Sequence, residues 1–148
     1  MVDEKLLPPC GLFCGVCSIQ AAYRDNNTKL IEKLSRFYGV PSDQIVCEGC
    51  KSDNVFIYCR VCPILSCTAE RNLNGCHECD DFPCEHIENF PIEIGKRVIL
   101  RTVPQRRALG TEKWLEAEIE RYKCPSCGAP LYRGFPRCGK CKQPVAPD

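Results

Sequence analysis

Apolar side chains recur at helical spacing between residues 18 and 38. A polar stretch interrupts this pattern, so it predicts two helices, with Asn27 or Thr28 as the cap of the second and Gly39 as its end. A single helical turn is predicted after Ser42.

Three further helices are predicted over residues 64–72, from Pro83 to about Phe90, and from Thr111, its N-cap, to near Tyr122. The last of these has an apolar stripe of Trp114, Leu115 and Ile119, with Glu116, Glu118 and Glu120 outside it. Residues 91–110 form a basic segment, in which the apolar run 98–100 is expected to pack.

Cysteine makes up 15 of the 148 residues, which is far above ordinary usage. Six Cys-x-x-Cys pairs occur: Cys14/Cys17, Cys47/Cys50, Cys59/Cys62, Cys76/Cys79, Cys124/Cys127 and Cys138/Cys141. Two intervening residues let a tight turn aim both sulfurs at one ion. An odd number of cysteines would leave one thiol unpaired in a fully disulfide-bonded protein. A redox function of Cys-x-x-Cys pairs is expected where the pair lies between a strand and a helix of a βαβ unit, and the sequence pattern predicts no such unit. The spacing therefore favours metal binding.

The first residues carry acids where a signal peptide needs positive charge, and no run of about 18 apolar residues is present. We therefore expect a cytoplasmic protein that does not span a membrane. A reducing cytosol also disfavours structural disulfides.

Only 50 of the hydrophobic residues are not cysteine, which gives a modest core for a chain with several loops. Metal is then expected to contribute to folding. The expected fold is a small, irregular, metal-stabilised α+β structure with short helices, zinc knuckles and a C-terminal zinc ribbon. Its predicted domains are a cysteine-rich metal-binding domain (1–95), a basic segment with a connecting helix (96–122) and a zinc ribbon with a tail (123–148).

The C-terminal unit, residues 123–145, carries the strongest motif. Its two knuckles offer four candidate metal ligands, Cys124, Cys127, Cys138 and Cys141. Four soft thiolates suit tetrahedral zinc and leave no open position, so the site is expected to be structural. Gly128 and Gly139 are expected to supply turn conformations, and residues 130–132 suggest a short strand.

Eleven cysteines and His86 remain upstream, and together they would fill three four-ligand sites. These candidate metal ligands are Cys10, Cys14, Cys17, Cys47, Cys50, Cys59, Cys62, Cys67, Cys76, Cys79, Cys84 and His86. The sequence allows His86 to be either a ligand or a surface histidine, and it favours an exposed His77 that is not a ligand.

One partition of these ligands joins the Cys14/Cys17 knuckle to Cys47/Cys50. It joins the Cys59/Cys62 knuckle to Cys76/Cys79 in a second site. Interleaved pairings are equally allowed by the spacing.

An iron–sulfur cluster in the N-terminal half is the alternative to zinc, because soft thiolates select either. The spacing of Cys10, Cys14 and Cys17 is that of radical SAM enzymes, which hold a [4Fe–4S] cluster with three thiolates. Val16 stands where those enzymes usually carry an aromatic residue, and the chain is too short for their barrel. A simpler [4Fe–4S] site, used in electron transfer or redox sensing, remains open.

The segments from Cys10 to Cys17, from Cys47 to Cys50, from Cys59 to Cys62 and from Cys76 to Cys84 resemble the DUF3795 family of prokaryotic cysteine-rich proteins. The resemblance covers roughly residues 8–90. It implies zinc binding and supplies neither a reaction nor catalytic residues. The helix that begins near Gly110 and runs into the ribbon resembles an extension that some members carry.

No catalytic or cofactor-binding residue is assigned, because the sequence has no Ser-His-Asp set, P-loop or dinucleotide fingerprint. We expect a multi-zinc protein that is a non-catalytic interaction or regulatory module with a protein partner, and the sequence leans against an enzyme.

Nucleic-acid binding is a less favoured alternative. Residues 1–90 hold 8 Lys and Arg against 13 Asp and Glu, whereas residues 91–148 hold 12 against 6. The basic candidates are Lys96, Arg97, Arg101, Arg106, Arg107, Lys123, Arg133, Arg137, Lys140 and Lys142, with Tyr122, Tyr132 and Phe135 as candidate stacking residues. A basic surface that offsets the acidic N-terminal half is the favoured explanation.

Overall fold

The computed structural model describes residues 3–148, and its first α-helices are a pair joined by a short turn. Helix α1 spans Ser18–Arg24 and α2 spans Thr28–Tyr38. The Asn27 side chain accepts a hydrogen bond from Leu30 N (3.1 Å), and Gly39 ends α2 in a left-handed conformation (φ 67°). The predicted pair of helices and its cap are therefore confirmed.

Short helices alternate with cysteine-bearing loops in the middle of the chain. Helices α3, α4 and α5 span Ile57–Arg60, Pro63–Glu70 and Glu85–Glu88. Single turns of the tighter 3-10 helix lie at Glu4–Leu6 (η1), Cys14–Val16 (η2), Ser42–Gln44 (η3) and Cys76–Glu78 (η4). The helix predicted over residues 64–72 and the turn after Ser42 are confirmed, and α5 is shorter than predicted.

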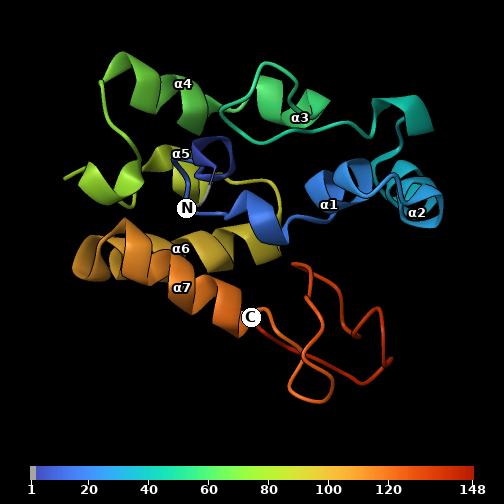
Figure 1. Ribbon diagram of the computed structural model, residues 1–148. Coiled ribbons are helices and arrows are strands. Elements are labelled where there is room, and N and C mark those ends of the chain that lie inside the picture. The colour runs from blue at the N-terminus through green and yellow to red at the C-terminus, as the bar shows by residue number, and fades with distance from the viewer. Residues whose placement is uncertain (1–2) are drawn as a thin grey trace.

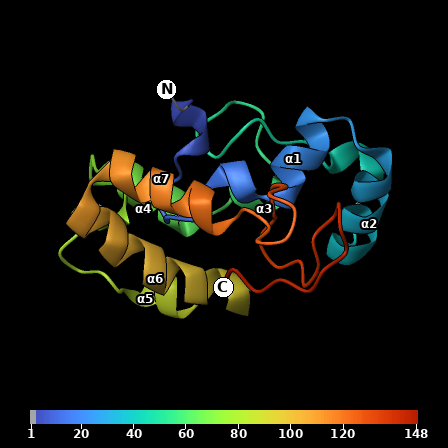
Figure 2. The same ribbon diagram turned by 60° about the horizontal axis from the view of Figure 1, so that its bottom comes forward.

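Helices α6 (Glu93–Leu109) and α7 (Thr111–Arg121) form a hairpin with Gly110 at the bend (φ 80°). Figures 1 and 2 both show them side by side. The hydrophobic pattern does not predict α6, because Pro104 lies inside it and basic residues dominate the segment. Its buried residues Val98, Ile99 and Val103 nevertheless share one helical face. The expectation that residues 98–100 pack is therefore correct for Val98 and Ile99 and wrong for Leu100, which is 39% exposed.

Two details predicted for α7 are wrong. Gly110 is its N-cap and Thr111 is its first helical residue. Glu118 is only 1% exposed, whereas Ile119 is 41% exposed, so their expected positions are exchanged. The cause is Arg101 on α6, whose Nη1 lies 2.5 Å from Glu118 Oε1, because a buried carboxylate needs a charged partner.

The buried residues form three clusters, and the first of them positions the ribbon. It contains Phe13, Val16, Trp114, Leu115, Tyr122, Leu131 and two ribbon cysteines. The rings of Phe13 and Trp114 meet edge to face with their centroids 6.4 Å apart. The N-terminal segment, α7 and the ribbon therefore share one core.

Polar contacts reinforce this docking of the ribbon, which lies below α1 and α2 in Figure 1. Arg133 N donates to Val16 O (3.0 Å), and Arg133 Nη2 donates to Phe13 O (2.7 Å). Lys33 Nζ on α2 lies 4.6 Å from the centroid of the Phe135 ring. The division of the chain into three domains stays a prediction.

Regular β structure is nearly missing from residues 3–148, where the β pairings are two isolated bridges, Lys123–Pro130 and Arg137–Pro144. The helical part of the expected fold class is confirmed, and the predicted strand at 130–132 does not form. No helix in this range is both long and apolar enough to cross a lipid bilayer.

Candidate metal centres

The four ribbon cysteines converge on one point. The Sγ atoms of Cys124, Cys127, Cys138 and Cys141 all lie within 4.8 Å of one another. Two Sγ–Sγ distances, Cys124–Cys141 and Cys127–Cys138, are both 3.6 Å. In a tetrahedral zinc–thiolate site with Zn–S distances of about 2.3 Å, sulfurs lie about 3.8 Å apart. The cluster can therefore hold one metal ion with every position filled by protein.

The two ribbon knuckles have the same backbone construction, offset by 14 residues. Gly128 N donates to Cys124 O (2.8 Å), and Lys142 N donates to Cys138 O (3.1 Å). Both donors have positive φ, 72° for Gly128 and 63° for Lys142. Gly139 does not have a positive φ, so the expected role of that glycine is taken by Lys142.

Backbone N–H groups favour the thiolate form in the ribbon. The N–H groups of Cys141 and Lys140 hydrogen-bond to the Cys138 sulfur and lower its pKa to about 6. The N–H of Cys127 likewise lowers the pKa of Cys124. Cys124 and Cys138 therefore lose their protons readily, and the thiolate is the form that binds metal. Cys141 differs, because burial and the neighbouring ribbon thiols raise its pKa to about 11.

A second set of cysteines, the Cys67 group, lines one small cavity. Its members are Cys67, Cys76, Cys79 and Cys84, and His86 lines the same cavity. The cavity has a volume of about 20 Å³, which is room for one ion or water molecule. Its other walls include Ile64, Phe82 and Ile87, so the sulfurs face an apolar enclosure.

Two arginines support the Cys67 group. Arg71 Nη1 donates to Cys79 Sγ (3.1 Å), which stabilises negative charge on that sulfur. Arg107 Nε donates to His77 O (2.9 Å), and Arg107 Nη2 donates to Cys79 O (2.6 Å). Arg71 and Cys79 are eight residues apart and Arg71 lies just beyond α4, so no local spacing could have found this contact.

The remaining cysteines form the seven-cysteine group, made of Cys10, Cys14, Cys17, Cys47, Cys50, Cys59 and Cys62. Burial raises the pKa of Cys10 to about 11 and that of Cys59 to about 12, and it also raises the pKa of Cys14 and Cys50. Neighbouring thiols add to each rise: Cys17 and Cys10 at Cys14, Cys10 and Cys14 at Cys50, Cys17 and Cys47 at Cys59. Mutual repulsion of this kind requires the three knuckles to lie close together.

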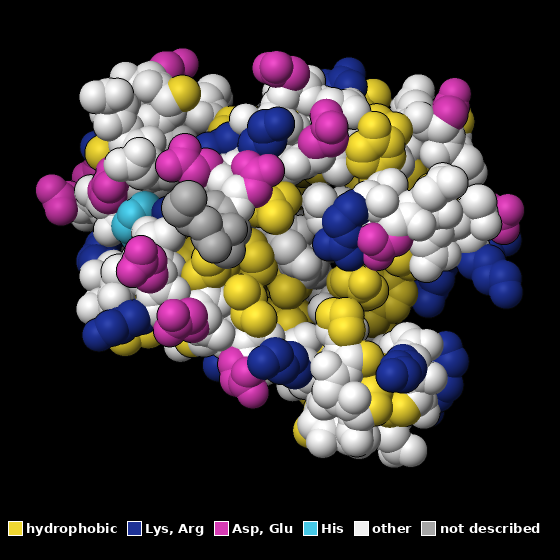
Figure 3. Space-filling model, in the orientation of Figure 1, with side chains coloured by type: hydrophobic (Ala, Val, Ile, Leu, Met, Phe, Trp, Pro, Cys, Tyr) yellow, Lys and Arg dark blue, Asp and Glu magenta, His cyan; other side chains and the backbone are white. Residues whose placement is uncertain are grey.

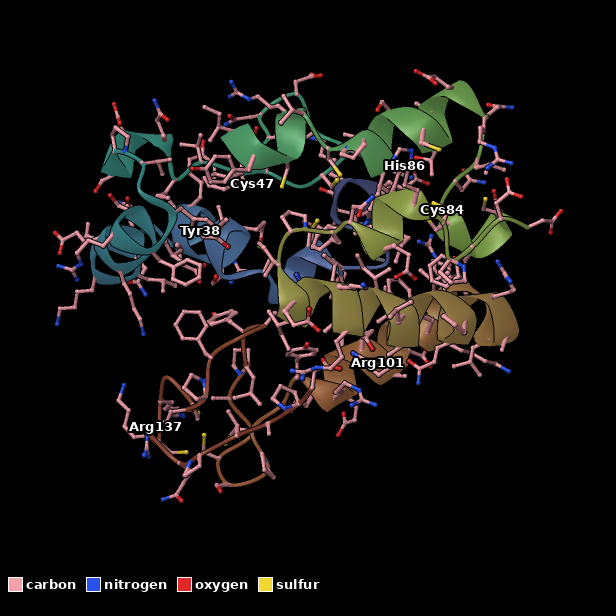
Figure 4. The ribbon with its side chains drawn as sticks, turned by 180° about the vertical axis from the view of Figure 1, so that it is seen from behind. Tyr38, Cys47, Cys84, His86, Arg101 and Arg137 are labelled. Carbon is pink, nitrogen blue, oxygen red and sulfur yellow. The ribbon has the colours of Figure 1, made fainter. Side chains whose placement is uncertain are left out.

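This arrangement differs from the partition suggested by the sequence. Cys59 packs with Cys17 and Cys47, and the Cys76/Cys79 knuckle lines one cavity with Cys67 and Cys84. Cys10 and Cys62 lie between the two groups, because both also pack in the cluster that contains Cys76 and Cys84. Helix α4 is the reason, because Cys62 is its N-cap and Cys67 is in its second turn, about 7.5 Å further along the axis. In Figure 4, Cys47 lies near α3 while Cys84 and His86 lie together beside α5.

The two histidines differ from each other. His86 lines the cavity of the Cys67 group, which leaves it available as a ligand. The His77 side chain is only 13% exposed, so the expectation of an exposed His77 is wrong. Its Nδ1 is enclosed and has no hydrogen-bond partner within residues 3–148.

A family model described as a protein of unknown function, DUF3795, matches residues 6–89. The chain belongs to the DUF3795 family. The matched segment contains both the seven-cysteine group and the Cys67 group and ends before α6, so the hairpin and the ribbon lie outside it. Neither the search of the curated proteins nor that of the solved structures gave a match.

Proposed function

We propose that this DUF3795 protein binds several zinc ions and acts as a non-catalytic interaction or regulatory module. The observation that carries the proposal is the ribbon quartet, whose four sulfurs lie within 4.8 Å of one another. A closed site has no position for a substrate, so its metal serves the fold. The Cys67 group offers a second set of four sulfurs around a cavity of ionic size.

The seven-cysteine group supports zinc as well, with a definite stoichiometry. Seven thiolates satisfy two tetrahedral ions when one sulfur bridges them. With one ion in each of the other two groups, the chain would bind four zinc ions. A [4Fe–4S] cluster would use four of the seven thiolates and leave three over.

An exposed aromatic patch supports a protein partner. Phe37 is 75% exposed and Tyr58 is 52% exposed, and both rings lie against Tyr38, with centroid distances of 4.9 and 6.0 Å. Hydrophobic side chains also gather near the centre of the face shown in Figure 3. Contiguous apolar surface of this kind marks sites of protein association.

The nucleic-acid alternative gains little support from the basic residues, because most of them have partners inside the protein. Lys96 and Lys123 bond to Glu88 and Glu120. The other partnered residues are Arg101, Arg106, Arg107, Arg133, Arg137 and Lys142. These side chains would have to break their internal contacts to bind the phosphates of a nucleic acid, so we expect weak nucleic-acid binding.

Elemental analysis with a visible spectrum, on protein purified without oxygen, tests the metal proposal. We expect a colourless protein with about four zinc ions per chain that loses helical circular dichroism when a strong chelator removes the metal. Iron in excess of zinc, with a brown absorbance that bleaches on reduction, would establish the Fe–S alternative. Full helicity after removal of all metal would contradict the structural role.

A pull-down with the zinc-loaded chain tests the partner. We expect the double variant Phe37→Ala/Tyr58→Ala to lose a partner that the wild type retains. Leu109→Ala is the matched control, because this residue is 46% exposed at the far end of α6. Equal retention by all three proteins would exclude the aromatic patch as the binding surface.

A further inference from the structure

A polar cleft of about 240 Å³ opens where four segments of the chain meet. Its walls come from η1, the loop at Lys51, the η4 turn and the junction of α6 with α7. Its charged, hydroxyl-bearing and imidazole side chains are Glu4, Lys51, His77, Glu78, Arg106 and Thr111. The sulfurs of the three cysteine groups do not line it, so the cleft is a separate feature of the surface.

Arg106 is the unusual member of this lining, because it is only 4% exposed. Its Nε donates to Thr111 Oγ1 (3.1 Å) and its Nη1 to Pro8 O (3.3 Å), while the guanidinium lies 5.0 Å from the centroid of Trp114. Within residues 3–148 no salt bridge involves Arg106, and its Nη2 has no protein acceptor. A buried charge without a paired charge is costly, and buried arginines normally face an anion.

Three other residues, His77, Thr111 and Lys51, bring polar atoms to the same cleft. His77 Nδ1 is enclosed and unpaired in the described part of the chain. The Thr111 hydroxyl already accepts a bond from Arg106, so its own proton is free to be donated into the cleft. Lys51 Nζ reaches Asn74 O at 3.4 Å, a weak bond that a better acceptor would replace.

The acidic groups of the cleft do not neutralise Arg106. Glu78 accepts hydrogen bonds from Asn74 N and Asn74 Nδ2, both 2.9 Å long, and its Oε1 lies 3.9 Å from His77 Nε2. Glu4 forms no salt bridge with any described residue. The attraction of Glu78 for the guanidinium acts without direct pairing.

We propose that this cleft binds a small molecule through its oxyanion, a carboxylate or a phosphate. The planar guanidinium of Arg106 matches either group, and Thr111 and Lys51 supply further donors. A volume of about 240 Å³ lies below the range typical of drug-sized ligands, so the ligand is a small metabolite and not a nucleotide.

The walls of the site are fixed before the ligand arrives. Arg107 holds the η4 turn through bonds to the carbonyls of His77 and Cys79, which places the imidazole beside Arg106. Because α6 carries both arginines, one helix supplies the anchor of the turn and the charge of the site. A preformed site loses less conformational freedom on binding.

Calorimetric titration of the full, metal-loaded chain with inorganic phosphate and with succinate tests the proposal. We expect saturable binding of at least one probe, with a Kd below about 10 mM at constant ionic strength. Arg106→Lys should weaken that binding at least about tenfold, because lysine cannot reproduce the planar fork. Binding of phosphate alone would assign a phosphate ester as the ligand class, and binding of succinate alone would assign a carboxylate.

Thr111→Val and Lys51→Met are milder variants that keep the proposal testable if Arg106→Lys fails to fold. Each should weaken binding about threefold while metal content and helicity stay unchanged. Arg97→Lys is the control, because it is an exposed residue of the same helix that does not line the cleft. Failure of both probes to bind, or equal binding by wild type and a folded Arg106→Lys, would overturn the proposal.

Discussion

The ribbon and the N-terminal cysteine groups use the same Cys-x-x-Cys motif in different electrostatic settings. In the ribbon, backbone N–H groups lower the pKa of Cys124 and Cys138, burial and the neighbouring thiols raise the pKa of Cys141 to about 11, and four sulfurs lie within 4.8 Å of one another. In the N-terminal part, burial raises the pKa of Cys10, Cys59 and Cys76. No N-terminal set among residues 3–148 brings its ligand atoms as close as the ribbon does.

This difference shows that a knuckle supplies only part of the charge balance of its site. A ribbon thiolate is stabilised by the N–H groups of its own turn, so that site is largely complete within residues 123–145. The Cys67 group instead receives guanidinium groups from outside its knuckle. Arg71, the C-cap of α4, donates to the Cys79 sulfur, and Arg107 on α6 donates to the Cys79 carbonyl. Arg107 therefore ties the basic C-terminal half to the cysteine-rich half through bonds to backbone carbonyls.

Acidification should release metal from the two regions at different pH values, and this is the largest effect we expect. Zinc must displace protons from its ligands, and more protons remain bound where the thiol pKa is raised. As pH falls from 8, zinc should leave the N-terminal groups first and the ribbon at least about one pH unit lower. A metallochromic indicator follows the release, and a ribbon variant that lacks its zinc assigns each step. Release of all the zinc in one step, or release from the ribbon first, would contradict the proposed difference between the ribbon and the N-terminal groups.

The metal-free chain provides the matching test. Cys138 has a folded pKa lowered from 9.0 to about 6, so its contribution to stability is present above pH 9 and is lost as pH falls through 6. Cys59 and Cys76 have pKa values raised to about 12, so their contribution is present below pH 9 and is lost as pH rises toward 12. Denaturant unfolding of the metal-free chain, measured between pH 6 and 9 and again between pH 9 and 12, tests both effects. The free energy of unfolding should rise with pH in the first range because of Cys138, and fall with pH in the second because of Cys59 and Cys76.

Removal of one ligand from each region sharpens the comparison further. Cys127→Ala should remove one zinc ion and leave the N-terminal ions bound, because the remaining three ribbon sulfurs no longer close the site. Cys79→Ala should remove one ion from the Cys67 group and leave the ribbon ion bound. Native mass spectrometry counts the ions in each variant.

Matched substitutions beside each ligand serve as controls. Ser126→Ala lies inside the ribbon knuckle, and Asp80→Ala follows Cys79 directly; neither should change the ion count. Structural zinc contributes on the order of 10 kcal/mol to small domains, so a local loss of structure should accompany each lost ion. Loss of all zinc in Cys127→Ala would mean that the two regions fold as one unit.

Local signals predicted one region of this protein much better than the other. The ribbon quartet and the Asn27 cap could be predicted because each lies in one short stretch of the chain, the quartet within residues 124–141 and the cap three residues from its donor Leu30. The ligand sets upstream could not, since the direction of α4 sends Cys62 and Cys67 to different groups. Spacing along the chain carries no information about that direction.

Buried charge explains the other differences from the sequence prediction. Glu118 was expected on the polar side of α7, yet it pairs with Arg101, which also bonds to Asp148. Arg106 was expected on a basic surface, yet it is buried against Trp114. Hydrophobic periodicity assigns charged residues to solvent, so it cannot foresee pairs that α6 and α7 form only once they pack.

The docking of the ribbon should depend on Arg133, and this is the smallest effect we expect. Arg133→Met removes the bond from Nη2 to Phe13 O, which costs about 1.5–3 kcal/mol for a charged donor. Arg137→Met is the control, because its guanidinium bonds to Lys142 O within the ribbon and is exposed. Denaturant unfolding of the zinc-loaded proteins should show the loss for Arg133→Met alone, with the zinc count unchanged. If Arg133→Met lowered the free energy of unfolding no more than Arg137→Met, the ribbon would gain no stability from this contact with the N-terminal region.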